Sequence, residues 1–170
     1  MSFKSVPFES LSFNPFTKIG HEWALLTAGV EGSCNTMTVS WGGVGFIWGK
    51  PVVTVYVRPQ RYTKEFIDRE DFFTLSFYGE EHKPALGYLG KASGRDGDKV
   101  AHVGFTPAFS HGTSYFEEAE LVFVCRKMSR TLIGADSFID KEADSKFYPE
   151  HDYHEMYIAE VVDVLVKEAE

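Results

Sequence analysis

The sequence is poor in cysteine and in basic residues, and it has no long apolar run. Its 170 residues include two cysteines, too few for a disulfide framework or a cysteine-rich zinc site. Acidic residues number 25 against 17 lysines and arginines, a formal charge of −8, so the chain lacks the positive field that nucleic acid requires. No apolar run approaches the roughly 20 residues of a membrane-spanning helix, and residues 1–16 do not look like a signal peptide. We expect a cytoplasmic protein that binds neither membranes nor nucleic acid.

Signatures of common hydrolases and nucleotide-binding folds are also missing. There is no G-x-S-x-G nucleophile elbow, no Walker loop and no strand–G-x-G-x-x-G–helix unit. Neither Cys34 nor Cys125 lies in a setting that would activate its thiol. His151 and His154 are three residues apart at the expected start of a strand, where such positions point to opposite faces. We therefore expect no metal site.

What the sequence has in excess is aromatic side chains, with 15 Phe, 8 Tyr and 3 Trp. Such residues favour strands, large cores and surfaces that stack on a flat partner. Apolar or alternating segments predict strands over residues 23–28, 36–41, 51–57, 72–78, 120–125 and 156–166. The glycines of 42–49 suggest close approach by another strand or a ligand. Short helices are predicted over 63–69, 84–91 and 140–147. Since strands outnumber helices without regular alternation, residues 1–170 should form one mainly β domain, a barrel or a sandwich.

The turn between the strand over 51–57 and the helix over 63–69 combines Arg58, Arg61 and Thr63. A helix start offers free backbone N–H groups and partial positive charge, and arginine adds forked hydrogen bonds. This turn therefore suits a phosphate. The alternative is a plain strand–turn–helix with surface arginines and Thr63 as an ordinary N-cap.

Two other segments carry polar residues that allow two interpretations each. The loop over 90–99 has three glycines, together with Ser93, Arg95 and Lys99, and it either grips a phosphate or is a solvated loop with surface ion pairs. Residues 35–42 place small hydroxylated side chains beside Trp41. They either line a flat aromatic ligand or form a half-buried strand with Ser and Thr outward.

Four motifs together resemble the flavin reductase-like family of FMN-binding split barrels, and within it the flavoredoxin-type subgroup. The resemblance covers residues from about 15 to 166, and the motifs come in the order found in that family. They read N-x-M-T-x-S-W-G over 35–42, R-P-x-R-Y-T over 58–63, G-x-x-S-G-R-D-x-D-K over 90–99 and H-x-M-Y-I-A-E-V over 154–161.

This resemblance implies a Greek-key split β-barrel with a few short helices, which forms a homodimer and holds FMN near the subunit interface. It implies three groups of cofactor-binding residues and one catalytic residue. The isoalloxazine ring would lie along Thr36, Met37, Thr38, Val39, Ser40 and Trp41. The phosphate and ribityl end would be bound by Arg58, Arg61, Tyr62 and Thr63, and the same cofactor would be closed over by Ser93, Arg95 and Lys99. The catalytic residue would be His154, beside the nicotinamide.

The resemblance is compatible with two functions. The first is an NAD(P)H-dependent FMN oxidoreductase, which transfers hydride from NADH or NADPH to the flavin. The second is an FMN-containing electron carrier of the flavoredoxin kind, which exchanges electrons with a redox protein partner. A flavin-free ligand-binding barrel is a third possibility, but it would leave the arginine-rich turn without a role.

Overall fold

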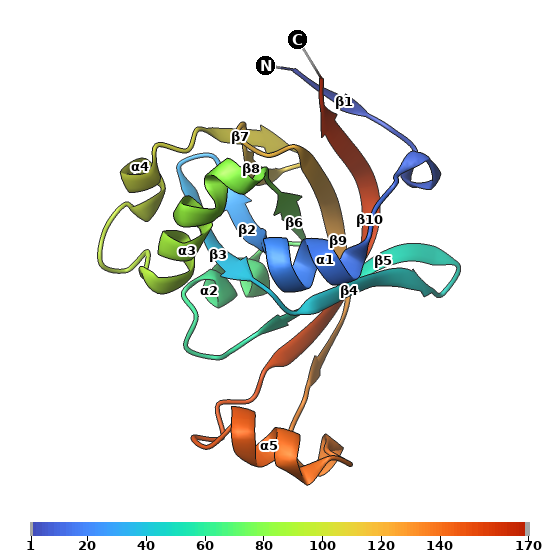
Figure 1. Ribbon diagram of the computed structural model, residues 1–170, viewed down its shortest axis with the longest axis vertical. Coiled ribbons are helices and arrows are strands. Elements are labelled where there is room, and N and C mark those ends of the chain that lie inside the picture. Colours follow the sequence, from blue (N-terminus) through green and yellow to red (C-terminus); the bar gives the residue numbers. More distant parts are fainter. Residues whose placement is uncertain (1, 169–170) are drawn as a thin grey trace.

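The protein, seen here as a computed structural model that describes residues 2–168, is built on one antiparallel sheet (Figure 1). The strand order is β3-β2-β6-β9-β10-β5-β4, and β1 also pairs with β10. A separate hairpin joins β7 and β8. The strands are β1 (Phe3–Ser5), β2 (Ala24–Val30), β3 (Ser33–Val39), β4 (Gly42–Ile47), β5 (Lys50–Val57), β6 (Phe72–Phe77), β7 (Pro107–Ser110), β8 (Thr113–Phe116), β9 (Leu121–Leu132) and β10 (Glu155–Lys167).

The helices are short and lie around the sheet rather than between its strands. They are α1 (Pro15–Thr17), α2 (Thr63–Arg69), α3 (Lys83–Lys91), α4 (Lys99–Val103) and α5 (Lys141–Phe147), with single turns η1 (Phe8–Ser10), η2 (Lys18–Glu22), η3 (Glu80–His82) and η4 (Ala135–Ser137). Five of the predicted strands and the three predicted helices are confirmed within a few residues, and β4 falls on the glycine-rich segment. The strand predicted over 120–125 begins correctly, but β9 continues to Leu132.

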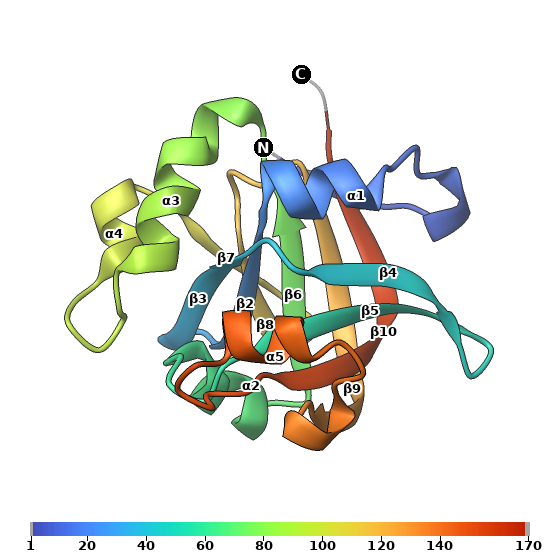
Figure 2. The same cartoon turned by 60° about the horizontal axis from the view of Figure 1, so that its bottom comes forward.

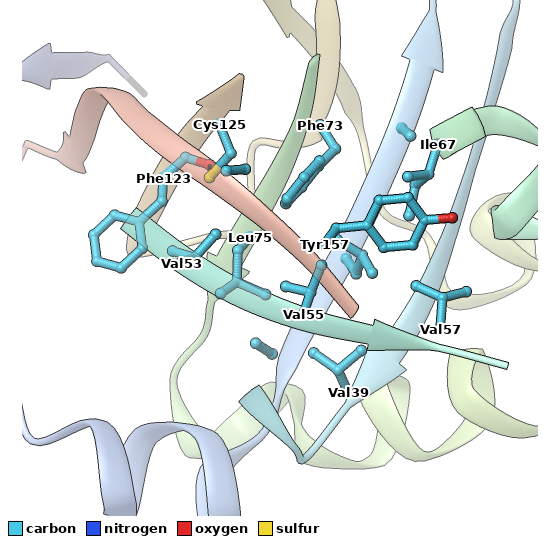
Figure 3. Close-up of a cluster of buried hydrophobic side chains, with 14 of the residues drawn as sticks. Val39, Val53, Val55, Val57, Ile67, Phe73, Leu75, Phe123, Cys125 and Tyr157 are labelled. Atoms are coloured by element: carbon cyan, nitrogen blue, oxygen red, sulfur yellow. Dashed lines mark hydrogen bonds between the residues drawn. The ribbon is translucent and has the colours of Figure 1, made fainter. Parts of the chain in front are cut away.

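The sheet rolls around a core that follows directly from side-chain alternation. In β5, Val53, Val55 and Val57 point to one face and are fully buried. They pack with large side chains from other strands, including Phe73 and Tyr157 (Figure 3). Burial of each such side chain contributes about 1.5–3 kcal/mol. A second cluster lies under α3, α4 and the β7–β8 hairpin.

The two end strands of the sheet, β3 and β4, are consecutive in the chain. Among the described residues no backbone hydrogen-bond ladder joins β3 to β4. At this place the two strands are connected only by the chain between them, residues 40 and 41 (Figure 2). The glycines that follow allow β4 to lie tightly on β5: a Cβ added at Gly42 would come 2.9 Å from the Thr54 carbonyl oxygen. The predicted close approach is thus made by a neighbouring strand.

Helix α3 lies against β3 and brings its C-terminal end to the same region. The Thr38 hydroxyl donates to the Leu86 carbonyl at 2.5 Å. A Cβ added at Gly90 would lie 3.0 Å from Thr38 Cβ, so glycine permits this contact. The carbonyls at the end of α3, which have no partner within the helix, therefore lie close to the end of β3.

Strands β9 and β10 extend together beyond the rest of the sheet, and α5 lies at their far end (Figure 1). We call residues 133–154, which join these two strands, the connecting segment. Helix α5 begins where the Asp140 side chain accepts a hydrogen bond from the Glu142 N–H. The connecting segment folds back onto the turn after β5, because Arg58 binds both Asp152 and the Phe147 carbonyl.

Candidate active site

A cleft of about 350 Å³ opens where the barrel is split. The ladder between β5 and β10 pairs Val57 with Glu155. It therefore brings Arg58, just after β5, next to His154, just before β10. The end of β3 completes the walls. The lining residues are Met37, Thr38, Val39, Ser40, Trp41, Tyr56, Arg58, Gln60, Arg61 and His154.

Arg61 brings positive charge to the cleft. Its guanidinium donates to the Gly90 carbonyl at 2.9 Å, at the C-terminal end of α3. Burial and the neighbouring Arg58 lower the pKa of Arg61, yet an arginine stays protonated at any physiological pH. Arg58 differs, since it forms an ion pair with Asp152 at 2.5 Å. Within residues 2–168 no carboxylate pairs with Arg61, so its charge is available to an anion.

Lys99 is a second cation at the same helix end. Its ammonium donates to the carbonyls of Leu89 and Ala92, each at 2.9 Å, and the residue is buried. Burial, with a smaller effect from Arg61, lowers the pKa of Lys99 to about 8. No ion pair neutralises it in the described part of the chain. Carbonyl dipoles therefore solvate two cations that no full negative charge compensates.

His154 forms the opposite kind of wall, neutral and aromatic. Its Nδ1 atom lies 2.7 Å from the Tyr148 hydroxyl, and its ring lies 5.5 Å from that of Trp41. Burial, and next the Arg58 charge, lower the pKa of His154 to about 4, so the imidazole is uncharged at neutral pH. Trp41 is 45% exposed and meets Phe147 edge-on at 5.3 Å. The cleft thus has one flat apolar side.

Eight of the 14 residues predicted from the sequence line this cleft, and the other six lie outside it. Thr36 is buried, with its hydroxyl 2.8 Å from that of Thr27. Tyr62 and Lys99 line an adjoining cavity of about 530 Å³. Ser93 and Arg95 line neither space; the Arg95 guanidinium lies over the Tyr62 ring at 4.6 Å and pairs with Glu65.

Thr63 is not the N-cap of α2, which corrects the sequence interpretation. The cap position is Tyr62, without a side-chain capping bond. The Thr63 hydroxyl is buried and accepts a hydrogen bond from Asn35 Nδ2 at 2.8 Å. It joins α2 to β3, and this tertiary contact outweighs the local capping preference.

Sequence reasoning missed Tyr56, Gln60 and Tyr148. Tyr56 belongs to a segment that the sequence predicts as a strand, but no motif indicates that its side chain faces a binding site. Gln60 is the unspecified position of the R-P-x-R motif, and its side chain donates to Asp152 at 2.8 Å. Tyr148 carries no motif, because only the fold of the connecting segment brings it to His154.

Other kinds of site have little support among the described residues. No three histidine, cysteine or carboxylate side chains between residues 2 and 168 gather closely enough to hold a metal ion. The same part of the chain has no helix with the length and apolar character needed to cross a membrane.

The fold is shared by solved structures of low sequence identity, among them the following three. The FMN-binding domain of a flavin reductases-like enzyme from Shewanella baltica OS155 is 16% identical, with a TM-score of 0.69 over 97% of this chain and 77% of that one. The flavoredoxin from Methanosarcina acetivorans is 21% identical, with a TM-score of 0.68 over 86% and 69%. The styrene monooxygenase flavin reductase (SMOB) from Pseudomonas putida S12 is 22% identical, with a TM-score of 0.63 over 87% and 80%.

These matches show the fold, a mainly antiparallel β structure of the FMN-binding split-barrel type with a few short helices. A comparison with curated proteins finds no match. The family model described as the Flavin reductase like domain matches residues 16–170. The chain therefore belongs to the flavin reductase-like family of FMN-binding proteins.

Proposed function

We propose that the chain binds FMN in the cleft and transfers hydride from NADH or NADPH to it. The observation that carries this proposal is the combination of an uncompensated guanidinium, Arg61, with a flat wall of Trp41 and neutral His154 in one space. A volume of about 350 Å³ lies within the usual range of ligand sites. These residues fit a planar, phosphate-bearing cofactor.

The phosphate end of FMN is best placed near Arg61. The chain carries a formal charge of −8, so a dianion needs a local cationic site. Arg61 supplies a guanidinium without a carboxylate partner, and Lys99 adds positive potential from behind the end of α3. Both cations are withdrawn from bulk water, which strengthens their attraction for an anion.

The ring end is best placed along the end of β3, beside Trp41 and His154. When bound, FMN supplies the hydride-accepting chemistry, and the protein supplies binding, orientation and electrostatics. Trp41 and Phe147 shield one side of the cleft from water. His154, uncharged at neutral pH, offers a hydrogen-bonding group without adding a charge that would have to be desolvated.

A homodimer with FMN near its interface is part of the proposal. Large side chains are exposed on α1, at the end of β4 and in the β4–β5 turn: Phe16 at 86%, Phe46 at 66% and Trp48 at 56%. Aromatic residues of this kind are enriched in protein interfaces, and a second copy of the chain would cover them. A cytoplasmic location is also proposed, supported by two free cysteine thiols.

A second candidate function is electron transfer with a redox protein partner, in the manner of a flavoredoxin. The exposed rim of the cleft, where Trp41 and Phe147 are 45% and 40% accessible, favours it. A protein partner needs only to reach this rim, whereas a nicotinamide must enter the cleft.

One anaerobic experiment separates these functions. The full chain is purified, loaded with FMN and mixed with NADH or NADPH while the visible flavin absorbance is followed. Rapid bleaching by either nucleotide supports the oxidoreductase. Retained flavin that neither nucleotide bleaches, but a reduced ferredoxin does, supports the carrier. FMN that is lost on gel filtration, while added FMN is still bleached by either nucleotide, contradicts the carrier alone. Loss of FMN together with no bleaching of added FMN contradicts both functions and supports a flavin-free binding protein.

A further inference from the structure

Tyr148 and His154 form a buried hydrogen-bonded pair at the cleft. The Tyr148 hydroxyl lies 2.7 Å from His154 Nδ1, the rings meet edge-on at 5.5 Å, and the two residues are only 7% and 8% exposed. Tyr148 follows α5 in the connecting segment, so this segment, and not the barrel, supplies the partner of His154.

The chemistry of the two groups decides which one donates. A neutral imidazole nitrogen is a strong acceptor, whereas a phenolic oxygen is a weak one. Burial raises the pKa of Tyr148, so the phenol keeps its proton. Tyr148 therefore donates to Nδ1, and the single imidazole proton resides on Nε2.

Tyr148 is itself held in place from both sides. The Arg58 guanidinium lies over its ring at 4.9 Å and donates to the adjacent Phe147 carbonyl at 2.9 Å. On the other side, Tyr153 packs at 4.9 Å and Phe138 at 5.6 Å between ring centroids. The hydroxyl has little freedom to leave His154.

The other nitrogen of His154 is available to a ligand. Nε2 has no hydrogen-bond partner among residues 2–168, and the ring lines the cleft. The charged groups that act on His154 are Arg58, Asp152 and Arg61. Burial and these arginines outweigh the single carboxylate, so protonation of the ring is disfavoured.

We propose that Tyr148 is a positioning residue that keeps His154 in the Nε2–H tautomer, which gives the cleft a fixed, uncharged hydrogen-bond donor. Such a donor fits a carbonyl or carboxamide oxygen, such as that of a nicotinamide, and would not bind a cation. The importance of this donor for hydride transfer rests on the proposed function. The tautomer itself does not.

The test measures the tautomer directly, by ¹⁵N chemical shifts of the imidazole nitrogens in the labelled full chain with and without FMN. In the unaltered protein, Nδ1 should show the shift of an unprotonated acceptor and Nε2 that of an N–H. In Tyr148→Phe, both tautomers should be populated. Its His154 pKa should rise, because donation to Nδ1 stabilises the neutral ring, but it should stay below the ordinary value, because burial and Arg58 continue to lower it.

Tyr153→Phe is the matched control. It removes a hydroxyl from the same aromatic cluster, but that hydroxyl donates to Asp144 at 2.8 Å and not to His154. The control should leave the His154 shifts unchanged. With FMN and NAD(P)H, Tyr148→Phe should lower kcat/KM roughly three- to tenfold, the loss of one hydrogen bond, and Tyr153→Phe should not.

An Nδ1–H tautomer in the unaltered protein overturns the proposal, whether or not the variants fold. Unchanged His154 shifts in Tyr148→Phe overturn it too. An equal change of the His154 ¹⁵N shifts in Tyr148→Phe and Tyr153→Phe overturns it as well, because it would indicate displacement of the connecting segment. Nε2–H shifts without any nicotinamide reaction would instead uphold the tautomer and contradict the reductase function.

Discussion

The guanidinium of Arg58 lies 2.5 Å from the carboxylate of Asp152, and this ion pair seats the connecting segment on the cleft. Gln60 donates to the same carboxylate oxygen at 2.8 Å. Arg58 lines the cleft, and its role in binding the cofactor phosphate stays a prediction. Its donors also hold the segment that carries Phe147 and Tyr148.

Asp152→Ala should loosen the connecting segment. The amides of residues 141–152 should exchange faster with deuterium, while those of β5 and β6 keep their protection. Asp136→Ala is the control, because Asp136 lies in the same segment and forms no ion pair among the described residues. Equal exchange in both variants would contradict a seating role for Asp152.

The attachment of the connecting segment through Asp152 should also depend on pH. Hydrogen bonds from Gln60 and Arg58 lower the pKa of Asp152 below its ordinary value near 4. A carboxylate with a depressed folded-state pKa adds stability above the unfolded value, and that stability is lost as pH falls through the folded value. Protection factors over 141–152 should therefore be constant from pH 7 to 5 and fall below pH 4. The same fall in Asp152→Ala would assign the effect to another group.

Arg61→Gln should weaken FMN binding roughly ten- to a hundredfold, since a charge-assisted hydrogen bond contributes about 1.5–3 kcal/mol. Fluorescence quenching of FMN on titration with protein measures the Kd. Arg126→Gln removes an arginine on β9 that pairs with Glu160 on β10. It is the charge-matched control and should bind FMN normally.

Arg95→Gln distinguishes two placements of the phosphate. In the structure Arg95 pairs with Glu65 and lies over Tyr62, outside the cleft, so its loss should change the Kd less than threefold. A loss of affinity as large as that of Arg61→Gln would show that the loop over 90–99 reaches the cofactor, as the motif resemblance implies.

The sequence predicts the sheet well where a single physical signal dominates. β5 is β-branched and alternating, so its bounds and its buried face are both readable. α4 was missed because five residues are too short for periodicity, although the Asp98 side chain caps it by accepting from the Ala101 N–H. The end of β9 was missed because the residues beyond Cys125 are mostly polar: they form an extended pair with β10 that has exposed faces.

The site was predictable only in part, because its residues come from segments that meet only in the folded chain. Val39, Arg61 and His154 belong to motifs far apart in sequence, and their meeting depends on the β5–β10 ladder and the turn at Ser40. The motif resemblance anticipates that meeting, but composition and spacing do not. Tyr148 lacks any local signal, since its role exists only because Arg58 draws the connecting segment onto the cleft.

Lys99 should titrate well below an ordinary lysine. Its pKa is lowered to about 8 in the folded chain, whereas an unfolded lysine titrates near 10.4. Between these values the unfolded chain binds the extra proton, so this group makes stability rise with pH from about 8 to 10. The ¹³Cε shift of Lys99 should titrate near pH 8. In urea unfolding, Lys99→Met should lose this rise and the exposed Lys91→Met should retain it. A Lys99 midpoint above pH 10 would contradict its burial.

Thr63→Val should destabilise the fold without impairing the cofactor site. The substitution is nearly isosteric, but it leaves Asn35 Nδ2 with only a 3.5 Å contact to the Thr36 carbonyl, and an unsatisfied buried donor costs about 1–3 kcal/mol. Thr63→Ser keeps the acceptor oxygen and should cost less. Thr113→Val is the control, since that buried hydroxyl makes only a 3.5 Å contact with the Phe72 carbonyl; urea midpoints measure all three.

The same variant separates a structural role for Thr63 from a cofactor-binding one. At a temperature where Thr63→Val is fully folded, its FMN Kd should match that of the unaltered chain, because the Thr63 side chain is buried between α2 and β3 and does not line the cleft. A Kd raised as far as in Arg61→Gln would mean that FMN binding moves the start of α2 and exposes the Thr63 hydroxyl to the phosphate. In that case the contact with Asn35 would be broken on binding, and the stability that FMN adds would be smaller in Thr63→Val than in Thr63→Ser.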